Sequence, residues 1–149
     1  MAEPATPAVK APWHLWVVAI VAVLWNAMGV VDFTLTQARN PAYLKAFTPL
    51  QIEYLHNFPL WAVIGWGAGV YGGFLGAILL LFRQGWAVSV FLVSLAGAVL
   101  TTLYSHVLSD LDKVMGGGAG AVIFSVVICI VAALLWWYAR AMTRRGVLR

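Results

Sequence analysis

Residues 58–82 read FPLWAVIGWGAGVYGGFLGAILLLF, a run of 25 residues that contains no charged side chain. An α-helix needs about 20 apolar residues to cross the hydrocarbon core of a bilayer, so this stretch is long enough to span a membrane by itself. Three further runs also lack Asp, Glu, Lys and Arg over a comparable length: residues 11–31, 84–109 and 114–139. The sequence therefore predicts four membrane-spanning helices, with cores near residues 13–33, 59–82, 86–108 and 118–138.

The composition of the chain supports the same conclusion. Of its 149 residues, 63% are hydrophobic and 9% are charged, whereas globular chains average about 25% charged residues. Too few charges remain to cover a water-facing surface, which excludes a soluble enzyme, a disordered chain and a secreted disulfide scaffold. Cys129 is the single cysteine, so an intramolecular disulfide is excluded as well. We expect an all-α integral membrane four-helix bundle, with residues 1–149 forming one membrane domain in contact with the lipid bilayer.

The distribution of charge between the two sides of the bundle predicts its orientation. Four spans place both termini on one side, together with the tight turn at residues 83–85 between the second and third spans. That side carries six cations and one acid, whereas the other side carries three cations and four acids. Because cytoplasmic loops carry an excess of Lys and Arg, we expect residues 1–12 and 139–149 to be cytoplasmic tails of a bacterial inner-membrane protein. The pI near 9.6 is then a signal of topology rather than of nucleic-acid binding.

Residues 34–57 form the one long connection, and they contain a helix-start pattern. Thr48 fits an N-cap, Pro49 the first helical position and Gln51 the third, which closes a capping box. We therefore expect a short amphipathic helical element from about residue 49 to residue 57, lying on the outer (periplasmic) surface. It is interpreted either as a lid that covers the ends of the bundle or as a lid that gates a ligand.

The second predicted span carries a stripe of glycines at helical spacing. Three pairs have the G-x-x-x-G spacing, which lets helix backbones approach closely in lipid, where apolar burial alone does not drive association. The stripe is interpreted as tight packing within one bundle or as the seam of a homo-oligomer, and the sequence does not separate the two. The candidate packing residues are Gly65, Gly69, Gly72, Gly73 and Gly76.

Four polar side chains are the candidate substrate-binding residues. Asn26 lies within the first span, where it could hydrogen-bond a neighbouring helix or line a polar path. Asp32 lies six residues further on, near the outer interface, where it could pair with Arg39 or Lys45 or bind a solute, since ionisable groups at membrane depth are functional candidates. His106 and Asp110 are four residues apart and are expected on one helix face at the same outer side. With the other acidic and histidine residues of that side they are interpreted as a cation or proton site or as a solvated acidic rim, and these residues are Asp32, Glu53, His56 and Asp112.

The sequence contains no pattern that points to a metal, a cofactor or an enzyme. It lacks H-E-x-x-H and paired cysteines, which are typical of metal sites. Two histidines that could face each other as haem ligands are not evident, because His56 is expected in the loop. No arrangement of nucleophile, base and orienting group is recognisable from spacing alone. We therefore expect no metal, no cofactor and no catalytic residue.

Several short motifs resemble those of a group of small four-span bacterial inner-membrane proteins that are often labelled "sugar transporter" in genome records. The shared motifs are Trp25-Asn26-x-x-Gly29, Thr48-Pro-Leu-Gln, Phe58-Pro-Leu-Trp61, Gly69-x-x-Gly72-Gly73-x-Leu-Gly76, Leu79-Leu-Leu-Phe-Arg83, Trp86-Ala and Phe91-x-x-Ser94-Leu-x-Gly97. The layout, with a long outer loop after the first span and a tight hairpin between the second and third, is also similar to that of DoxX-like four-helix proteins. The first resemblance implies transport, and the second implies an accessory role beside respiratory or redox enzymes.

Two functional hypotheses follow from these features. The first is a small transport-type protein for a neutral or cationic solute, assembled as a homo-oligomer. It rests on Asn26, on the outer acidic residues and on the first resemblance. The second is a non-catalytic accessory or assembly subunit of a larger membrane complex, which rests on the scarcity of buried ionisable groups and on the glycine stripe.

Overall fold

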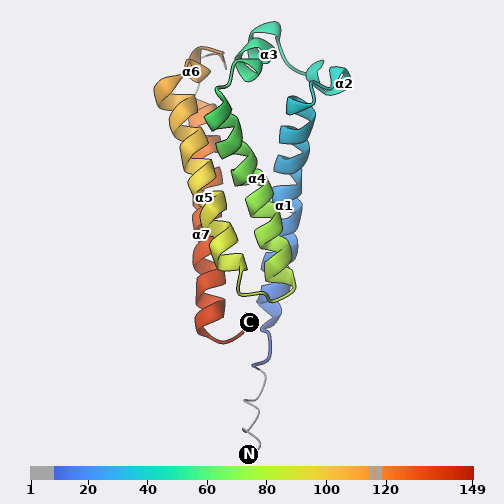
Figure 1. Cartoon of the computed structure of the whole chain (residues 1–149), viewed down its shortest axis with the longest axis vertical. Helices are drawn as coiled ribbons and strands as arrows, with labels where there is room; N and C mark the ends of the chain where they lie inside the picture. Colours follow the sequence, from blue (N-terminus) through green and yellow to red (C-terminus); the bar gives the residue numbers. More distant parts are fainter. Residues whose placement is uncertain (1–8, 115, 117–118) are drawn as a thin grey trace, which may run out of the picture.

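The computed structural model describes residues 9–114, 116 and 119–149, and every element in these ranges is helical (Figure 1). Four helices are long and apolar enough to cross a membrane. They are α1 (Trp13–Gln37), α4 (Leu60–Leu81), α5 (Ala87–Leu103) with its continuation η1 (Tyr104–Leu108), and α7 (Ala119–Arg144). Three short helices, α2 (Pro41–Leu44), α3 (Pro49–His56) and α6 (Leu111–Val114), lie at one end of the bundle, here named the loop end. The predicted all-α four-helix membrane bundle is confirmed.

The second and third spans agree with their predicted ranges, but the first and fourth helices are longer. α1 continues past residue 33 to Gln37, and α7 continues past residue 138 to Arg144. The predicted boundaries follow hydropathy, which marks the hydrocarbon core, whereas a helix ends where a backbone signal stops it. For α7 that signal is Gly146, whose φ of 70° ends the helix in a Schellman motif closed by a Val147 N–H bond to the Met142 carbonyl at 3.0 Å. Residue 118, the expected start of the fourth span, lies outside the described residues.

The helix predicted in the outer loop is confirmed as α3. The Thr48 hydroxyl accepts a hydrogen bond from the Gln51 N–H, and the Gln51 side chain accepts one from the Thr48 N–H. These reciprocal bonds satisfy backbone donors that a helix start leaves unpaired. The Tyr54 hydroxyl also lies 2.7 Å from the Ser109 hydroxyl, so α3 is tied to the segment that follows η1.

The four long helices form a row in which each span packs on the previous one. The helix pairs in extensive contact are α1 with α4, α4 with α5 and α5 with α7. α1 and α7 are therefore the outer members of the row. They meet where α1 begins and α7 ends, here named the terminal end, in a buried cluster that includes Leu15, Leu80, Met142 and Leu148. This cluster fills the terminal end of the bundle.

The segment after α7 also closes the terminal end. It was expected within the tail 139–149, and its last residues pack on the bundle. Val147 and Leu148 are buried. The Gly85 N–H donates to the Arg149 carbonyl at 2.7 Å, and the Arg149 N–H donates to the Arg83 carbonyl at 2.9 Å. The Arg83 guanidinium adds bonds to the carbonyls of Val147 and Val9. Residues 147–149 are thus held against the turn that joins α4 to α5.

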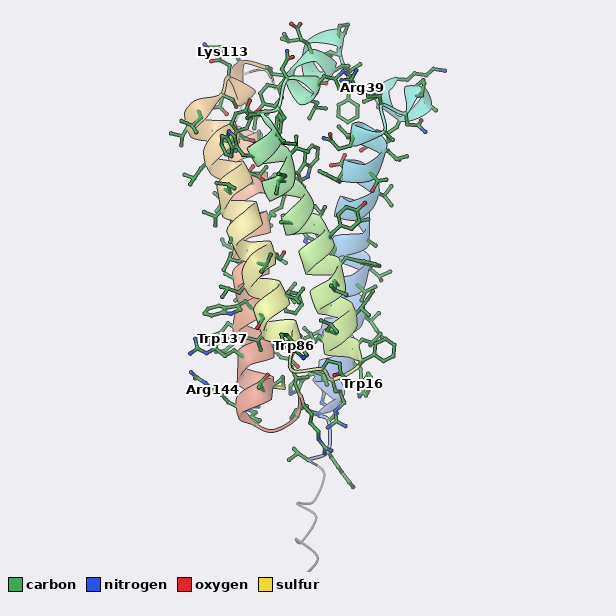
Figure 2. The ribbon with its side chains drawn as sticks, viewed as in Figure 1. Trp16, Arg39, Trp86, Lys113, Trp137 and Arg144 are labelled. Carbon is green, nitrogen blue, oxygen red and sulfur yellow. The ribbon has the colours of Figure 1, made fainter. Side chains whose placement is uncertain are left out.

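Tryptophans and charged residues mark the two ends of the bundle. Figure 2 shows Trp16, Trp86, Trp137 and Arg144 toward the terminal end, and Arg39 and Lys113 at the loop end. The three tryptophans are exposed, as expected of rings that favour a membrane–water interface. Large apolar side chains are exposed along all four long helices, which gives the bundle a surface suited to lipid.

All five glycines of the predicted stripe lie against other helices of the same chain. A Cβ at Gly65, Gly69 or Gly72 would meet α5, one at Gly76 would meet the ring of Phe91, and one at Gly73 would meet Asn26 and Ser94. The closest approach to the backbone of another helix is on the α5 side, where a Cβ on Gly97 would lie 2.6 Å from the Gly69 nitrogen and also overlap the Gly65 carbonyl. The glycine stripe therefore packs against α1 and α5 of the same chain.

Gly97→Ala should weaken the bundle, because the added methyl group would meet the backbone of α4, which cannot rotate away. We expect a loss of about 1–3 kcal/mol in the free energy of unfolding, as is usual for overpacking. Gly120→Ala is the matched control, since nothing lies within 4 Å of its Cβ position, and it should leave stability unchanged or raise it by up to about 1 kcal/mol. Denaturant unfolding in detergent micelles, followed by tryptophan fluorescence, measures both. Equal stability of the two variants would show that the α4–α5 contact is not tight.

Candidate functional site

A cavity of about 450 Å³ lies among the four long helices. Its volume falls within the range of about 300–1,000 Å³ found for small-molecule sites. Side chains of α1, α4, α5 and α7 all contribute to its walls, so the row curves around it. The terminal core bounds it on one side through Phe91, which belongs both to that core and to the cavity lining.

The walls of the cavity are mainly apolar and aromatic, with a few polar groups distributed among them. Trp25, Trp66, Phe91 and Phe124 supply aromatic surface. A lining of this kind, with a small number of placed polar groups, is typical of sites for small molecules. The polar contributors are Asn26, Asp32, Ser94, Thr101, Thr102, Ser105 and Ser125.

Asn26 lines this cavity, but it does not bond a neighbouring helix as one interpretation expected. Its amide nitrogen donates to the Ala22 carbonyl of its own helix at 2.7 Å. Its amide oxygen lies against Gly73, where a Cβ would overlap it. Gly73 thus provides the space that lets a carboxamide sit in the cavity wall at this depth.

Most hydroxyl groups around the cavity are already engaged. Ser94 Oγ donates to the Gly69 carbonyl at 2.6 Å, which adds a cross-helix bond at the glycine contact. Thr101 Oγ1 donates to the Gly97 carbonyl of its own helix at 2.9 Å. Thr102 Oγ1 lies 3.4 Å from Cys129 Sγ, between α5 and α7. The oxygen atoms of these groups line the cavity, but the groups already form hydrogen bonds within the protein.

Asp32 lines the cavity and has no cationic partner among the residues described. Pairing with Arg39 or Lys45 was one expectation, but both of these side chains are exposed and the ion pairs in the described chain are His106–Asp112 and Lys113–Asp110. Instead the Tyr43 hydroxyl of α2 donates to the Asp32 carboxylate. Pairing fails because α1 stays helical through this region and α2 then brings a tyrosine, rather than a lysine, over the carboxylate.

An aromatic cluster at the loop end holds one wall of the cavity in place. The Phe33 and Trp66 rings meet edge-on with centroids 5.0 Å apart, and Phe58 lies 4.8 Å from the Tyr104 ring. Phe58 also contacts Trp66 at 5.8 Å. The Trp66 ring therefore contacts rings from α1 and from the loop that precedes α4.

The expected pairing of His106 with Asp110 on one face does not form. His106 lies in η1, a π-helical turn, and the chain becomes extended at Ser109, so a residue four positions further on no longer lies on the same face. Asp110 instead pairs with Lys113 at 2.6 Å on the surface, and it does not line the cavity. His106 lies behind the cavity wall, with Nε2 2.9 Å from the hydroxyl of Ser125, a cavity residue.

Ser125 and the hydroxyl face of the third span line the cavity, although the sequence did not single them out as candidate binding residues. The small residues at positions 94, 98 and 101 of α5 and at position 105 of η1 all line the cavity. Their spacing predicts a close helix contact equally well, so the signal was present but ambiguous. Aromatic residues from four different helices contribute as well. The mid-span positions of Trp25 and Trp66 indicated either packing or a ligand wall, whereas Phe91 and Phe124 had no sequence signal.

Among residues 9–114, 116 and 119–149, no group of three or more His, Cys, Asp or Glu side chains is arranged to hold a metal ion. Comparison of the chain with protein-family models, with curated proteins and with solved structures finds no match in any of the three. The site therefore has to be interpreted from its own geometry.

The Tyr43–Asp32 contact gives a prediction about alkaline pH. Burial raises the pKa of Tyr43 from 10.0 to about 12, with further contributions from the hydrogen bond to Asp32 and from the repulsion between phenolate and carboxylate. Because this pKa is higher in the folded protein, the stabilisation is complete below pH 10 and is lost as the pH rises to about 12. Thermal unfolding between about pH 9 and pH 12 should show a larger loss of stability in the native protein than in Tyr43→Phe.

Tyr71→Phe is the control for that experiment, because it removes a tyrosine hydroxyl that contacts Thr34 rather than a carboxylate. This variant should keep the alkaline loss of stability. If native protein and Tyr43→Phe lose stability in parallel up to pH 12, the Tyr43–Asp32 bond does not form in solution.

Proposed function

We propose that this chain is a small inner-membrane protein of the transport type, which binds a small neutral or cationic solute in the cavity between its four spans. The observation that carries the proposal is the cavity itself. It combines aromatic walls with the carboxyl group of Asp32, which has no cationic partner among the described residues. A single chain encloses this volume, so binding does not require a path shared between protomers.

The chemistry of the walls favours a solute that carries a cation on an apolar body. A cation near Asp32 would gain the charge partner that this carboxylate lacks within the described chain. The faces of Trp25 and Trp66 would add cation–π attraction, which is worth about 0.5–2 kcal/mol depending on desolvation. Trp25, Trp66, Phe91 and Phe124 would bury the apolar part.

The core that fills the terminal end closes the cavity on that side, and the aromatic cluster at the loop end forms part of its wall. Together they support access to the cavity from one side of the membrane. We infer that the structure corresponds to a state closed toward the cytoplasm, where the 147–149 segment and the terminal core would block passage. The distribution of cations supports this orientation, since Lys10, Arg83, Arg140, Arg144, Arg145 and Arg149 all belong to the terminal side.

The alternative of an accessory subunit has less support from the same observations. It relied on the glycine stripe as a surface for a partner, and that stripe is occupied by α1 and α5 of this chain. The scarcity of buried ionisable groups among the described residues is the support that remains for an accessory role.

A matched pair of probes tests the proposal directly. Benzyltrimethylammonium and its uncharged carbon isostere, neopentylbenzene, have nearly the same shape and differ in charge. Calorimetric titration in lipid nanodiscs should show that the cation binds more tightly, and that Asp32→Asn weakens its binding by about tenfold while leaving the neutral probe unchanged, as expected for an interaction of about 1.4 kcal/mol.

Ala132→Phe tests where the probes bind, because Ala132 lines the cavity on α7 and a phenyl group there would fill it. Both probes should then lose most of their affinity. Ala96→Phe on the exposed face of α5 is the control of equal size and should have no effect. Binding that survives Ala132→Phe in full would place the probes outside the cavity and contradict the proposal. Uptake of labelled benzyltrimethylammonium into proteoliposomes then distinguishes transport from binding.

The orientation has its own test. On the Cys129→Ala background, a cysteine at Leu50, which is exposed on α3, should react with a membrane-impermeant maleimide in intact spheroplasts. A cysteine at Thr143, which is exposed near the end of α7, should react only after the membrane is opened. The opposite pattern would place the loop end in the cytoplasm.

A further inference from the structure

Three polar side chains lie in sequence from the loop-end surface to the cavity wall. Asp112 of α6 has a carboxylate oxygen 3.5 Å from His106 Nδ1, and His106 Nε2 lies 2.9 Å from Ser125 Oγ on α7. The Asp112 side chain is 55% exposed and that of His106 is 12% exposed. Ser125 lines the cavity. One end of this series therefore faces water and the other end faces the candidate binding site.

The backbone at His106 is altered in a way that creates this alignment. Residues 104–108 form a π-helical turn at the end of an otherwise regular α-helix. Such turns are rare and frequently lie at functional sites. Here the wider turn directs His106 toward α7, and the extended residue Ser109 lets the chain double back so that α6 brings Asp112 to the other ring nitrogen.

His106 also has a ring nitrogen that packing does not use. Nδ1 is buried and has no hydrogen-bond partner, so Asp112 is close enough for ion pairing without forming a directed bond. A buried donor or acceptor left in this state costs free energy. An imidazole that served only to join α5 to α7 would need Nε2 alone.

The same three residue types occur in serine hydrolases, but the surroundings here do not supply the rest of that chemistry. A nucleophilic serine needs donors aimed at the oxygen that becomes negative in the transition state. The cavity donors Asn26, Ser94 and Thr101 are bonded to backbone carbonyls, and Ser125 lies within the hydrogen-bonded body of α7. The arrangement favours proton transfer over acyl transfer.

We propose that Asp112, His106 and Ser125 form a proton path between the outer solution and the cavity, so that a proton and a cationic solute compete for occupancy. This inference rests on the proposed function. A proton from water, received directly or by way of Asp112, binds His106 Nδ1, and the imidazolium then passes its Nε2 proton to Ser125 Oγ while the serine hydroxyl releases its own proton to water in the cavity. Only N–H and O–H bonds form and break. The positive ring beside the cavity disfavours a cation inside it, and entry of the cation releases the proton along the same path.

The charged and titratable groups around His106 are consistent with this role. From α6 the facing group is Asp112, while Asp110 and Lys113 of the same segment pair with each other at 2.6 Å. α7 presents Ser125, with Cys129 one turn further on and bonded to Thr102. α3, which packs on α6, carries Glu53, Tyr54 and His56. Histidine is the side chain whose charge ordinarily changes between about pH 5 and pH 8.

Binding of benzyltrimethylammonium at different pH values tests the proposal. In nanodiscs, affinity for the cation should fall about fivefold or more between about pH 7.5 and pH 5.5, as is typical of coupled sites, and affinity for neopentylbenzene should change much less. Titrations in two buffers of different ionisation enthalpy should show that protons are released when the cation binds. His106→Gln should abolish both effects, because its amide can still donate to Ser125 but cannot titrate.

Two further variants separate a proton path from a structural contact. His14→Gln is the control, since His14 lies at the terminal end beside Tyr138 at 2.5 Å, and it should retain the pH dependence. Asp112→Asn changes an exposed side chain and should fold normally. It should weaken the pH dependence of cation binding, because it removes the carboxylate that lies 3.5 Å from His106 Nδ1 at the outer end of the path.

The outcomes are distinct. Cation binding that is independent of pH, or proton release that persists in His106→Gln, overturns this inference and leaves the proposed function intact. Failure of both probes to bind the native protein at every pH overturns the two together. Covalent labelling of Ser125 by a fluorophosphonate, lost in His106→Gln, would identify an activated nucleophile and replace the proton path with acyl transfer.

Discussion

The close approach of α4 and α5 backbones is the contact on which the rest of the bundle depends. In lipid, helices gain little from apolar burial against each other, so association relies on close packing and hydrogen bonds. Here Gly97 lies directly against the Gly65–Gly69 stretch, and the Ser94 hydroxyl bonds the Gly69 carbonyl at the same place. Because these two helices are so close, α1 and α7 pack on the outer sides of the pair and the space between them remains as the cavity.

This arrangement also explains how polar groups are accommodated at membrane depth. Gly73 leaves room for the Asn26 amide, which satisfies its donor on its own helix. Ser94 and Thr101 satisfy their donors on backbone carbonyls. Two exceptions beside the cavity are Asp32, which has a tyrosine partner but no cation, and His106, which has one unbonded ring nitrogen. Both exceptions lie toward the loop end, next to the cavity, which is why the functional proposals concern these residues.

Much of the fold could be predicted from the sequence, because hydropathy and capping are local signals. Long uncharged runs identified four spans, and the Thr48–Gln51 pattern identified α3. Helix ends were less predictable. Hydropathy stops near Tyr138, whereas α7 stops at the glycine that adopts a positive φ, Gly146. The packing of residues 147–149 on Arg83 had no local signal, since it joins segments distant in sequence.

The candidate site was predicted only in part, and the reason is geometric. Asn26 and Asp32 could be singled out because polar residues are rare in apolar spans, and the structure places both in the cavity wall. The grouping of His106 with Asp110 was wrong because it assumed a regular helix, and the π-helical turn redirects His106 toward Ser125 and Asp112. Ser125 could not be distinguished from a packing residue without knowing which face of α7 meets α5.

The order of helices in the row has a consequence for how the protein is made. Each span packs on the span that precedes it in the chain, so each helix can join its partner as soon as it leaves the translocation machinery. No helix has to wait for a distant one, and no insertion between two helices already in contact is needed. The final step is different in kind, because residues 147–149 must reach back to Arg83. Biogenesis would therefore proceed as a sequential addition of helices that ends when this segment locks the terminal end.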